Sequence, residues 1–315
     1  MAKAVDYNAT LVGREDLTDA LTIFRFRFDA PPPETPWFVP GQYCVIGLNN
    51  EESPELGPSQ RPMSIASAPQ DNEIIEFYIR YVAHPTSQNP LTHLLWKLAE
   101  GDRAFVRPAP KGRFTITHLV GDEDARTKLM VAAGTGLAPF VSIVRDHQRR
   151  EPHATLSKYA ILHGASYPED LGYREELETL STDHGLRYLP TVSRAKERPS
   201  WSGMAGRVED LFLPERLEEV ENRLGLASGS IVPSEVAIFV CGLQGTIGRC
   251  IERLAPRGFV PEHRGMRKAL SVPEDVESSF FYEQYDTEPV IDLTDEALVA
   301  DLSEQLQAGI ARADG

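Results

Sequence analysis

The chain has 315 residues, and 41% of them are hydrophobic, which is enough to build the cores of two domains. The formal net charge is −15, and this acidic balance excludes a general nucleic-acid binder, which needs a basic surface to displace counterions. The cysteines are only Cys44, Cys241 and Cys250, a number that excludes a disulfide scaffold and a four-cysteine iron–sulfur cluster and favours a reducing, cytoplasmic location.

Residues 1–122 are predicted to form β structure. Runs of alternating polarity occur at residues 21–28, 43–48 and 74–82, separated by proline-rich loops. A helix is predicted at residues 90–98, with Pro90 in the first turn. Several short strands with one helix indicate a small antiparallel β-barrel of the Greek-key type.

After a polar linker at residues 121–127, the predicted elements alternate between strands and helices. Strands are predicted at residues 129–133, 159–163, 187–192 and 236–241, and helices at residues 138–149, 171–180, 208–222 and 246–254. Such alternation indicates a parallel sheet of the Rossmann-like α/β class. We therefore expect a two-domain chain with a barrel at 1–122 and an α/β domain at 123–285.

Residues 286–315 are predicted to form an acidic C-terminal extension with a helix. Leu298, Leu302, Leu306 and Ile310 recur at helical spacing, and Thr294 is a plausible N-cap residue. The pattern assigns no specific role to this helix.

One stretch of the chain, KLMVAAGTGLAPF at residues 128–140, is typical of a phosphate-binding device. A strand runs into Gly134, Thr135 and Gly136, and a helix follows with Pro139 in its first turn. Glycines allow the backbone to approach an anion closely, and a helix start offers unpaired N–H groups. The spacing GxGxxP departs from the usual dinucleotide fingerprint GxGxxG.

Segments that would indicate export, a membrane or a metal are not found. The N-terminal residues lack an apolar stretch of the kind found in signal peptides, and no apolar run approaches the ~20 residues of a membrane span. The eight histidines show no paired metal-ligand spacing, so we predict no metal site.

Four short motifs, taken in order with the glycine turn, resemble the ferredoxin–NADP reductase family. They are PGQY at residues 40–43, RPMS at 61–64, NPLT at 89–92 and VCG at 240–242. The resemblance runs from about residue 8 to about Tyr285. It implies FAD on the barrel, a nicotinamide dinucleotide on the parallel-sheet domain, and hydride transfer between nicotinamide C4 and flavin N5.

In the barrel, the family's RxYS motif matches Arg61, Pro62, Met63 and Ser64. The resemblance implies that Arg61 pairs with the flavin pyrophosphate and that the Ser64 hydroxyl lies near flavin N5. Met63 replaces the family's stacking aromatic. A thioether can still pack on a ring, and another aromatic, Tyr43 or Tyr81, could instead cover that face of the flavin.

Two further barrel segments resemble cofactor-binding elements of the family. At the start of the predicted helix, the N–H groups of Leu91 and Thr92 would hold the FAD pyrophosphate, with Asn89 in the left-handed conformation where the family has glycine. The loop around Gly112 resembles a family loop beside the flavin.

In the second domain, Gly134, Thr135, Gly136 and Pro139 match the family's dinucleotide loop. The family places a cysteine beside nicotinamide C4, and Cys241 with Gly242 matches that position. Glu283 and Tyr285 match a motif near the family's C-terminus, in which the tyrosine covers the flavin face and the glutamate relays protons. A cluster of core aromatics is an equally good interpretation of residues 280–285.

Arginines distinguish NADP from NAD because they bind the additional 2′-phosphate. Ser193 with Arg194 resembles one family position of this kind, and Arg207 resembles a second. A third family arginine is missing from the segment at residues 164–167. The resemblance thus favours FAD and NADP(H) as cofactors, with NAD(H) less favoured, while surface charge remains the alternative reading of Arg194 and Arg207.

Because the chain has no cluster that could store single electrons, the resemblance implies a separate one-electron carrier, a ferredoxin or a flavodoxin-like protein. Such carriers are acidic, and docking would need a basic patch. The candidate cations are Arg257, His263, Arg264, Arg267 and Lys268, with Arg145, Arg149 and Arg150 as possible additions.

Three alternatives to this function stay open. The first is an NADH-dependent reductase component of an oxygenase or hydrogenase complex, and the second is a non-catalytic flavin- or nucleotide-binding module that senses redox state. The third, less favoured, is an oxygen-reducing flavin reductase. The physiological acceptor, the direction of electron flow and the oligomeric state are left open by the sequence.

Overall fold

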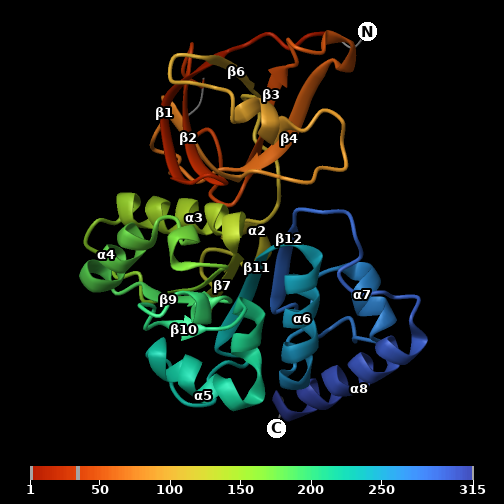
Figure 1. Ribbon diagram of the computed structural model, residues 1–315. Coiled ribbons are helices and arrows are strands. Elements are labelled where there is room, and N and C mark those ends of the chain that lie inside the picture. The colour runs from red at the N-terminus through yellow and green to blue at the C-terminus, as the bar shows by residue number, and fades with distance from the viewer. Residues whose placement is uncertain (1–2, 33–35, 314–315) are drawn as a thin grey trace. The chain divides into compact units, whose positions relative to one another are not determined.

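In the computed structural model, which describes residues 3–32 and 36–313, the chain divides into two compact units (Figure 1). The first comprises Met1–Gly121 and Ala138–Pro152, and the second comprises Asp122–Leu137 and His153–Gly315. The first unit contains an antiparallel six-stranded sheet and the second a parallel one, so the predicted two-domain fold class is confirmed.

The antiparallel sheet of the first unit has the strand order β4-β3-β6-β1-β2-β5. Its strands are β1 (Ala9–Thr18), β2 (Leu21–Phe28), β3 (Tyr43–Asn49), β4 (Pro58–Ser64), β5 (Ile74–Arg80) and β6 (Arg103–Val106). A bridge between Ile65 and Phe77 joins the end of β4 to β5, which closes the sheet into a barrel. Short helices interrupt it at η1 (Pro54–Leu56), α1 (Leu91–Leu95) and α2 (Ile116–Leu119).

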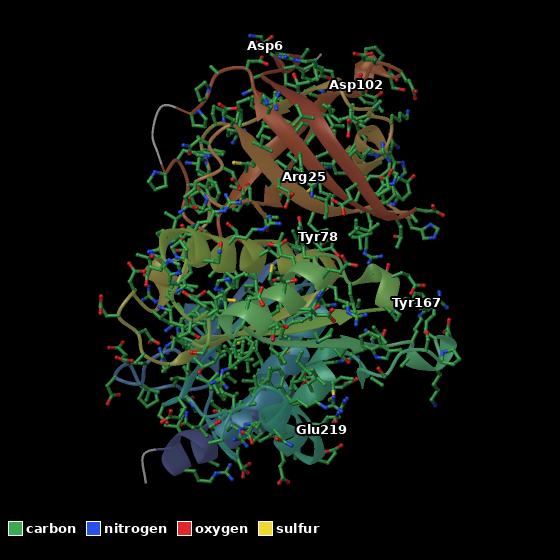
Figure 2. The ribbon with its side chains drawn as sticks, turned by 90° about the vertical axis from the view of Figure 1, so that its left-hand side faces the viewer. Asp6, Arg25, Tyr78, Asp102, Tyr167 and Glu219 are labelled. Carbon is green, nitrogen blue, oxygen red and sulfur yellow. The ribbon has the colours of Figure 1, made fainter. Side chains whose placement is uncertain are left out.

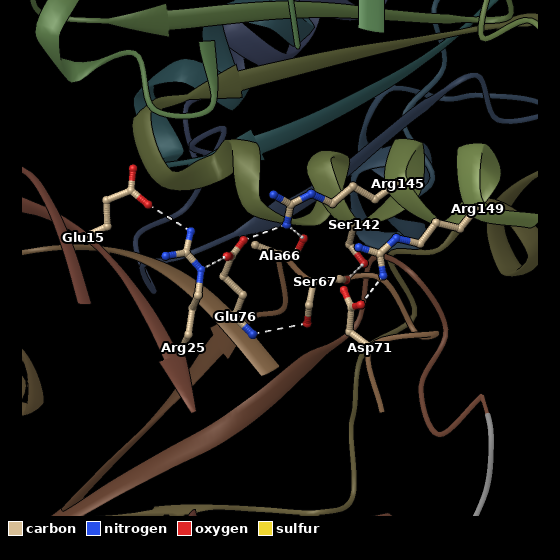
Figure 3. Close-up of polar contacts among 9 residues, drawn as sticks. All are labelled: Glu15, Arg25, Ala66, Ser67, Asp71, Glu76, Ser142, Arg145 and Arg149. Carbon is tan, nitrogen blue, oxygen red and sulfur yellow. Dashed lines mark hydrogen bonds and ion pairs between the residues drawn. The ribbon is translucent and has the colours of Figure 1, made fainter. Parts of the chain in front are cut away.

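Helix α3 (Ala138–Arg150) belongs to the first unit by its contacts, although the parallel-sheet segments flank it in the chain. Its residues bond the segment that follows β4 and the strand β5 (Figure 3). The Ser142 hydroxyl donates to the Ser67 carbonyl at 2.7 Å, and Arg145 donates to the Ala66 carbonyl at 3.0 Å. Arg149 pairs with Asp71. These contacts fix α3 on the barrel.

The parallel sheet of the second unit has the order β10-β9-β8-β7-β11-β12. Its strands are β7 (Thr127–Ala133), β8 (Tyr159–Ala165), β9 (Arg187–Val192), β10 (Met204–Ala205), β11 (Val236–Gly242) and β12 (Phe280–Gln284). The chain adds strands on one side of β7 and then returns to add β11 on the other side. The carboxyl ends of β7 and β11 therefore form the topological switch point, where α/β proteins bind ligands.

Among the described residues, six helices of the second unit supply apolar side chains to a shared core with the sheet. They are η5 (Val208–Phe212), α5 (Pro214–Arg223), α6 (Gln244–Leu254), η6 (Ala255–Arg257), α7 (Arg264–Ala269) and α8 (Glu296–Ala313). The unit also contains η2 (Gly134–Leu137), η3 (Pro168–Asp170), α4 (Arg174–His184) and η4 (Ala195–Glu197). The single helix predicted at residues 208–222 is in fact two, η5 and α5, because Pro214 starts a new helix after the extended Leu213.

The C-terminal helix α8 is an integral part of the second unit. Leu302 and Leu306 are buried in the core cluster. A Cβ at Gly309 would lie 2.3 Å from the backbone nitrogen of Gly258, so the absence of a side chain permits this close packing. The predicted N-cap is wrong by one residue. Asp295 accepts hydrogen bonds from the first helical N–H groups, whereas the Thr294 hydroxyl bonds Asp292.

None of the helices in residues 3–32 and 36–313 is both long and apolar enough to span a membrane. Within the same residues, no group of three or more histidine, cysteine, aspartate or glutamate side chains could hold a metal ion.

Candidate functional site

The glycine turn lies at the carboxyl end of β7, where η2 leads into α3. Gly134 has a positive φ of 56°, a conformation that disfavours other residues. A Cβ on Gly136 would lie 2.0 Å from the carbonyl oxygen of Cys241. The second glycine is therefore required by the close approach of the turn to β11, in addition to any approach of a phosphate. Pro139 stands in the first turn of α3, as predicted.

Four predicted site residues meet at the switch point. Cys241 is opposite Glu283 in the register of β11 and β12, and the Tyr285 hydroxyl is within hydrogen-bonding range of the Cys241 thiol. The same hydroxyl donates to the Thr135 carbonyl at 3.2 Å. The turn after β7 and the segment after β12 are thus joined directly beside Cys241, although some 150 residues separate them.

Burial raises the pKa of the Cys241 thiol well above its usual value, and the negative charge of Glu283 raises it further. The Tyr285 hydroxyl acts in the opposite direction without reversing the shift. Cys241 is therefore a neutral thiol at physiological pH, which suits a packing surface and not a nucleophile. Gly242, the next residue, is also buried and ends β11.

Arg194, the first arginine expected to bind phosphate, is exposed just after the end of β9 and contacts Tyr167. It donates to the Tyr167 hydroxyl at 2.8 Å, and its guanidinium carbon lies 5.4 Å from the centre of that ring. Tyr167, labelled in Figure 2, follows β8 in the segment where the third family arginine is missing. The backbone N–H of Ser193 bonds the Ala165 carbonyl at 3.0 Å, which fixes this segment against the end of β8.

Arg198 is a neighbour of this group that the sequence reasoning missed. Its guanidinium carbon lies 4.5 Å from the Tyr167 ring centre, and its Nε donates to Glu169 at 2.8 Å. The Tyr167 hydroxyl donates to Glu197 at 2.7 Å. No sequence spacing connects Tyr167 to Arg198, because only the parallel pairing of β8 with β9 brings the two loops together.

Arg207, the second predicted arginine, is exposed at the start of η5. Its backbone N–H donates to the Asp210 carboxylate at 3.1 Å, and Arg253 bonds the other oxygen of that carboxylate at 2.7 Å. Gly206, just before it, has a φ of 114°, which only glycine adopts readily. The backbone at Arg207 is therefore fixed while its side chain faces solvent.

In the first unit, Ser64, Tyr43 and Gly112 lie together. Tyr43 is opposite Ser64 in the register of β3 and β4, and it forms a bridge with Lys111. A Cβ on Gly112 would lie 3.1 Å from the Tyr43 ring, and Gly112 has a φ of 107°. Ser64 is almost fully buried. The serine of RPMS and the loop that contains Gly112 thus lie on opposite sides of Tyr43.

The residues around Ser64 decide which aromatic could replace the family's stacking ring. Met63 packs against the barrel core. Tyr81 is stacked on His93, with ring centres 4.6 Å apart and planes 10° apart, and also contacts Trp96. Tyr43 is the candidate that lies beside Ser64.

Arg61 and Pro62 are exposed on β4, and the Arg61 guanidinium bonds the Gln60 carbonyl at 2.7 Å. The start of α1 is tied to the same strand, because the Ser59 hydroxyl donates to the Asn89 carbonyl at 2.8 Å. The two segments predicted to hold the pyrophosphate are therefore neighbours.

Leu91 and Thr92 are the first residues of α1, where N–H groups lack partners within the helix. The prediction of a left-handed Asn89 is wrong. Apart from glycines, the described residues with positive φ are Tyr173 and Ser271. Asn89 instead shapes the turn with its side chain, which donates to the Gly57 carbonyl at 3.0 Å and accepts from Asn50 at 2.9 Å.

Most of the cations proposed for carrier docking are committed to internal contacts. Arg257 bonds the Ile231 carbonyl at 2.6 Å, and Arg267 bonds Ser278 and the carbonyls of the loop after α7. Within the first unit, Arg145 and Arg149 are ion-paired with Glu76 and Asp71. The proximity of these cations in the sequence therefore does not make a free basic patch.

The chain matches known proteins over most of its length. Residues 130–250 match the family described as "Oxidoreductase NAD-binding domain". The chain is 30% identical over 237 residues to ferredoxin–NADP reductase A of Sorangium cellulosum. This alignment covers 72% of this chain and 76% of that protein. It is 28% identical to the phenol hydroxylase P5 protein of Acinetobacter pittii, covering 70% of this chain and 56% of that protein.

A solved structure has the same fold. The ferredoxin NADP⁺ reductase from Neisseria gonorrhoeae, crystallised with FAD and NADP, aligns with a TM-score of 0.68 at 20% identity and covers 88% of this chain and 97% of its own. Together with the motifs and the arrangement of Thr135, Cys241 and Tyr285, the Sorangium relative shows that this chain belongs to the ferredoxin–NADP reductase family, whose members are oxidoreductases that bind FAD and NAD(P).

Proposed function

We propose that this protein passes electrons between NADPH and a one-electron carrier protein of the ferredoxin or flavodoxin kind, through FAD. The observation that carries the proposal is the meeting of Thr135, Cys241 and Tyr285 at the switch point of the parallel sheet. A phosphate-binding turn, a buried thiol and an aromatic side chain come together there, at the position where this sheet class binds dinucleotides.

On the dinucleotide side, the turn at Gly134–Leu137 offers backbone N–H groups to the pyrophosphate. The neutral Cys241 thiol presents a compact, uncharged surface to the nicotinamide ring. Tyr285 is 42% exposed, and the hydrogen bond of its hydroxyl to Thr135 contributes only about 0.5–1.5 kcal/mol, so its ring can leave its place when the dinucleotide enters. Glu283 lies next to this pair and is the candidate for moving a proton.

On the flavin side, Arg61 supplies a guanidinium to the pyrophosphate, and Leu91 and Thr92 supply N–H groups from the start of α1. The Ser64 hydroxyl is the donor for the reacting edge of the ring, and the Tyr43 ring takes the stacking role that Met63 does not fill. Bound FAD supplies the ability to take two electrons from a dinucleotide and release them one at a time.

The preference for NADPH rests on Arg194 and Arg207. Both are exposed, lie at the carboxyl side of the parallel sheet and have a fixed backbone. A guanidinium in a fixed position is the group that best recognises a phosphate. Arg198 adds a third guanidinium close to Arg194 through their shared contact with Tyr167.

The proposal is tested by purifying the protein, releasing its chromophore by denaturation and identifying it as FAD. Steady-state reduction of ferricyanide should then proceed with a lower KM for NADPH than for NADH. A protein that takes up FAD but reduces ferricyanide with neither dinucleotide would contradict the enzymatic role and favour the redox-sensing module.

A second candidate is an NADH-dependent reductase component of an oxygenase system. It is favoured by the similarity to the phenol hydroxylase P5 protein and by Glu169 and Glu197, two carboxylates that lie against Arg198 and Tyr167. Carboxylates at this position would repel a 2′-phosphate. A higher kcat/KM with NADH than with NADPH would select this candidate.

A further inference from the structure

The segment that follows Tyr285 and leads to α8 comprises residues 286–295, and we call it the strap. The carboxylate of its first residue, Asp286, accepts a hydrogen bond from the backbone N–H of Gln244 at 3.2 Å. Gln244 is the first residue of α6, and the N-cap residue, Leu243, makes no capping bond with its side chain. A carboxylate is favourable here because the helix dipole is positive at this end. Asp286 therefore caps a helix that begins 42 residues earlier in the chain.

This contact fixes the backbone around Tyr285. The Tyr285 N–H donates to the carbonyl of Gly242, the last residue of β11, at 3.1 Å. The side-chain amide of Gln284 donates to the other oxygen of the Asp286 carboxylate. The backbone on both sides of Tyr285 is thus held to the turn between β11 and α6, in addition to the bond from the ring hydroxyl to Thr135.

The rest of the strap is restrained as well. A Cβ on Gly248 would lie 2.3 Å from the Val290 carbonyl oxygen, so the strap backbone packs directly on α6. Ile291 is buried in the core of the second unit. Beyond the strap, α8 is bonded to the end of α7, because the Ser303 hydroxyl donates to the Leu270 carbonyl at 2.9 Å. The segment after β12 is therefore held at both ends.

We propose that Asp286 is a positioning residue that holds the Tyr285 ring over the glycine turn and thereby sets the affinity for the nicotinamide half of the dinucleotide. The inference rests on the proposed function, in which the ring leaves its place when the dinucleotide enters. A dinucleotide binds only those molecules whose site is open, so its apparent dissociation constant rises as the closed arrangement is stabilised. Because Asp286 acts through Tyr285, its removal should have no effect once the ring is absent.

The test compares Asp286→Ala with Asp292→Ala as the matched control. Asp292 belongs to the same strap, and its carboxylate bonds the N–H and the hydroxyl of Thr294 within the strap. Both variants remove one negative charge. Dissociation constants are measured by titration for NADP⁺, for NAD⁺ and for 2′,5′-ADP, which lacks the nicotinamide. The same titrations are made for Tyr285→Ser with and without Asp286→Ala, and FAD content and Tm are measured for every variant.

Asp286→Ala is expected to lower the dissociation constants of NADP⁺ and NAD⁺ alike, by about threefold or more, because the two share the nicotinamide half. The KM for NADPH should fall without a rise in kcat. Binding of 2′,5′-ADP and FAD content should match those of the unsubstituted protein, as should every property of Asp292→Ala. In the Tyr285→Ser background, Asp286→Ala should change none of the dissociation constants further.

Unchanged or weakened binding of NADP⁺ and NAD⁺ by Asp286→Ala, or an equal gain in Asp292→Ala, would overturn the proposal. Tighter binding of 2′,5′-ADP would also overturn it, because that result would show that Asp286 repels phosphate instead of holding the ring. A full effect of Asp286→Ala in the Tyr285→Ser background would have the same consequence. An unsubstituted protein that binds neither NADP⁺ nor NAD⁺ would instead contradict the proposed function.

Discussion

Arg145 on α3 donates from Nη1 to Oε1 of Glu76 on β5 at 2.6 Å, within the first unit. The other oxygen of Glu76 accepts from Arg25 on β2 at 2.6 Å, and Arg25 also bonds the exposed Glu15 (Figure 3). Glu76 is 6% exposed. One buried carboxylate therefore joins two strands of the barrel to the helix that begins at the glycine turn.

Replacing Glu76 by glutamine should destabilise the first unit by about 3–5 kcal/mol, because two guanidinium groups lose a buried counter-charge. Thermal unfolding of the purified variant measures the loss. The matched control is Glu15→Gln, which removes a half-exposed partner of the same arginine and should cost at most about 1 kcal/mol. Equal losses for the two variants would show that burial of the ion pair is unimportant.

A methyl group at Gly136 should disrupt the glycine turn, because its Cβ would lie 2.0 Å from the Cys241 carbonyl oxygen. Gly136→Ala is expected to raise the KM for NADPH at least tenfold while FAD content stays unchanged. Gly245→Ala, at a helical position with no atom within 4 Å of the added Cβ, should leave both properties intact. Steady-state rates at several NADPH concentrations and measurement of bound FAD check this prediction, and a Gly136→Ala variant with normal KM would contradict it.

The phosphate-recognition proposal predicts a difference between the two dinucleotides. Replacing Arg194 and Arg207 together by alanine should raise the KM for NADPH by about 100-fold, because each charged hydrogen bond contributes about 1.5–3 kcal/mol, and should change the KM for NADH little. Arg223→Ala on α5 is the control, since that arginine forms an exposed pair with Glu219. If the KM values for NADPH and NADH change equally, the two arginines do not select the 2′-phosphate.

The free energy of unfolding should depend on pH through His163, a fully buried residue of β8 whose Nδ1 lies 3.0 Å from the Tyr188 hydroxyl. Its Nε2 has no hydrogen-bond partner among the residues that the structure describes. Burial lowers the pKa of His163 to about 3. Between that value and the ordinary pKa near 6.5 the unfolded chain binds a proton that the folded chain does not. The stabilising contribution is therefore complete above pH 6.5 and decreases as the pH falls, by at most about 1.4 kcal/mol per pH unit.

Urea unfolding of the unsubstituted protein and of His163→Phe, at several values between pH 4.5 and 8, isolates this effect from the carboxylates that both proteins share. The stability of the unsubstituted protein relative to the variant should fall as the solution becomes more acidic. A constant difference across the range would show that the folded and unfolded chains bind the His163 proton equally well.

Sequence patterns predicted the elements whose periodicity and boundaries are clear. Strand β2 has the predicted limits because apolar residues alternate along Leu21–Phe28 between two turns. Strand β12 was not predicted, since Phe280, Phe281 and Tyr282 are consecutive aromatics without alternation. The parallel sheet buries both faces of that strand's first residues, and a buried strand has no alternating pattern.

Some features of the candidate site could likewise be predicted from the sequence, and others could not. The glycine turn and the RPMS strand are local motifs and could be predicted from the sequence. The contact of Tyr285 with Thr135, and the grouping of Arg198 with Tyr167, depend on which strands are neighbours, and that is not encoded in any short spacing. For the cations at residues 257–268, sequence proximity does not reveal that Arg257 and Arg267 bond backbone carbonyls.

The central claim is that this chain holds FAD and reduces it with NADPH. Anaerobic titration of the purified protein with NADPH, followed by visible absorption, tests it most directly. The account predicts a yellow protein whose flavin band bleaches as NADPH is added and recovers on admission of an electron acceptor. A folded protein that neither contains FAD nor takes it up, or one whose flavin band is unaffected by both NADPH and NADH, would contradict the account.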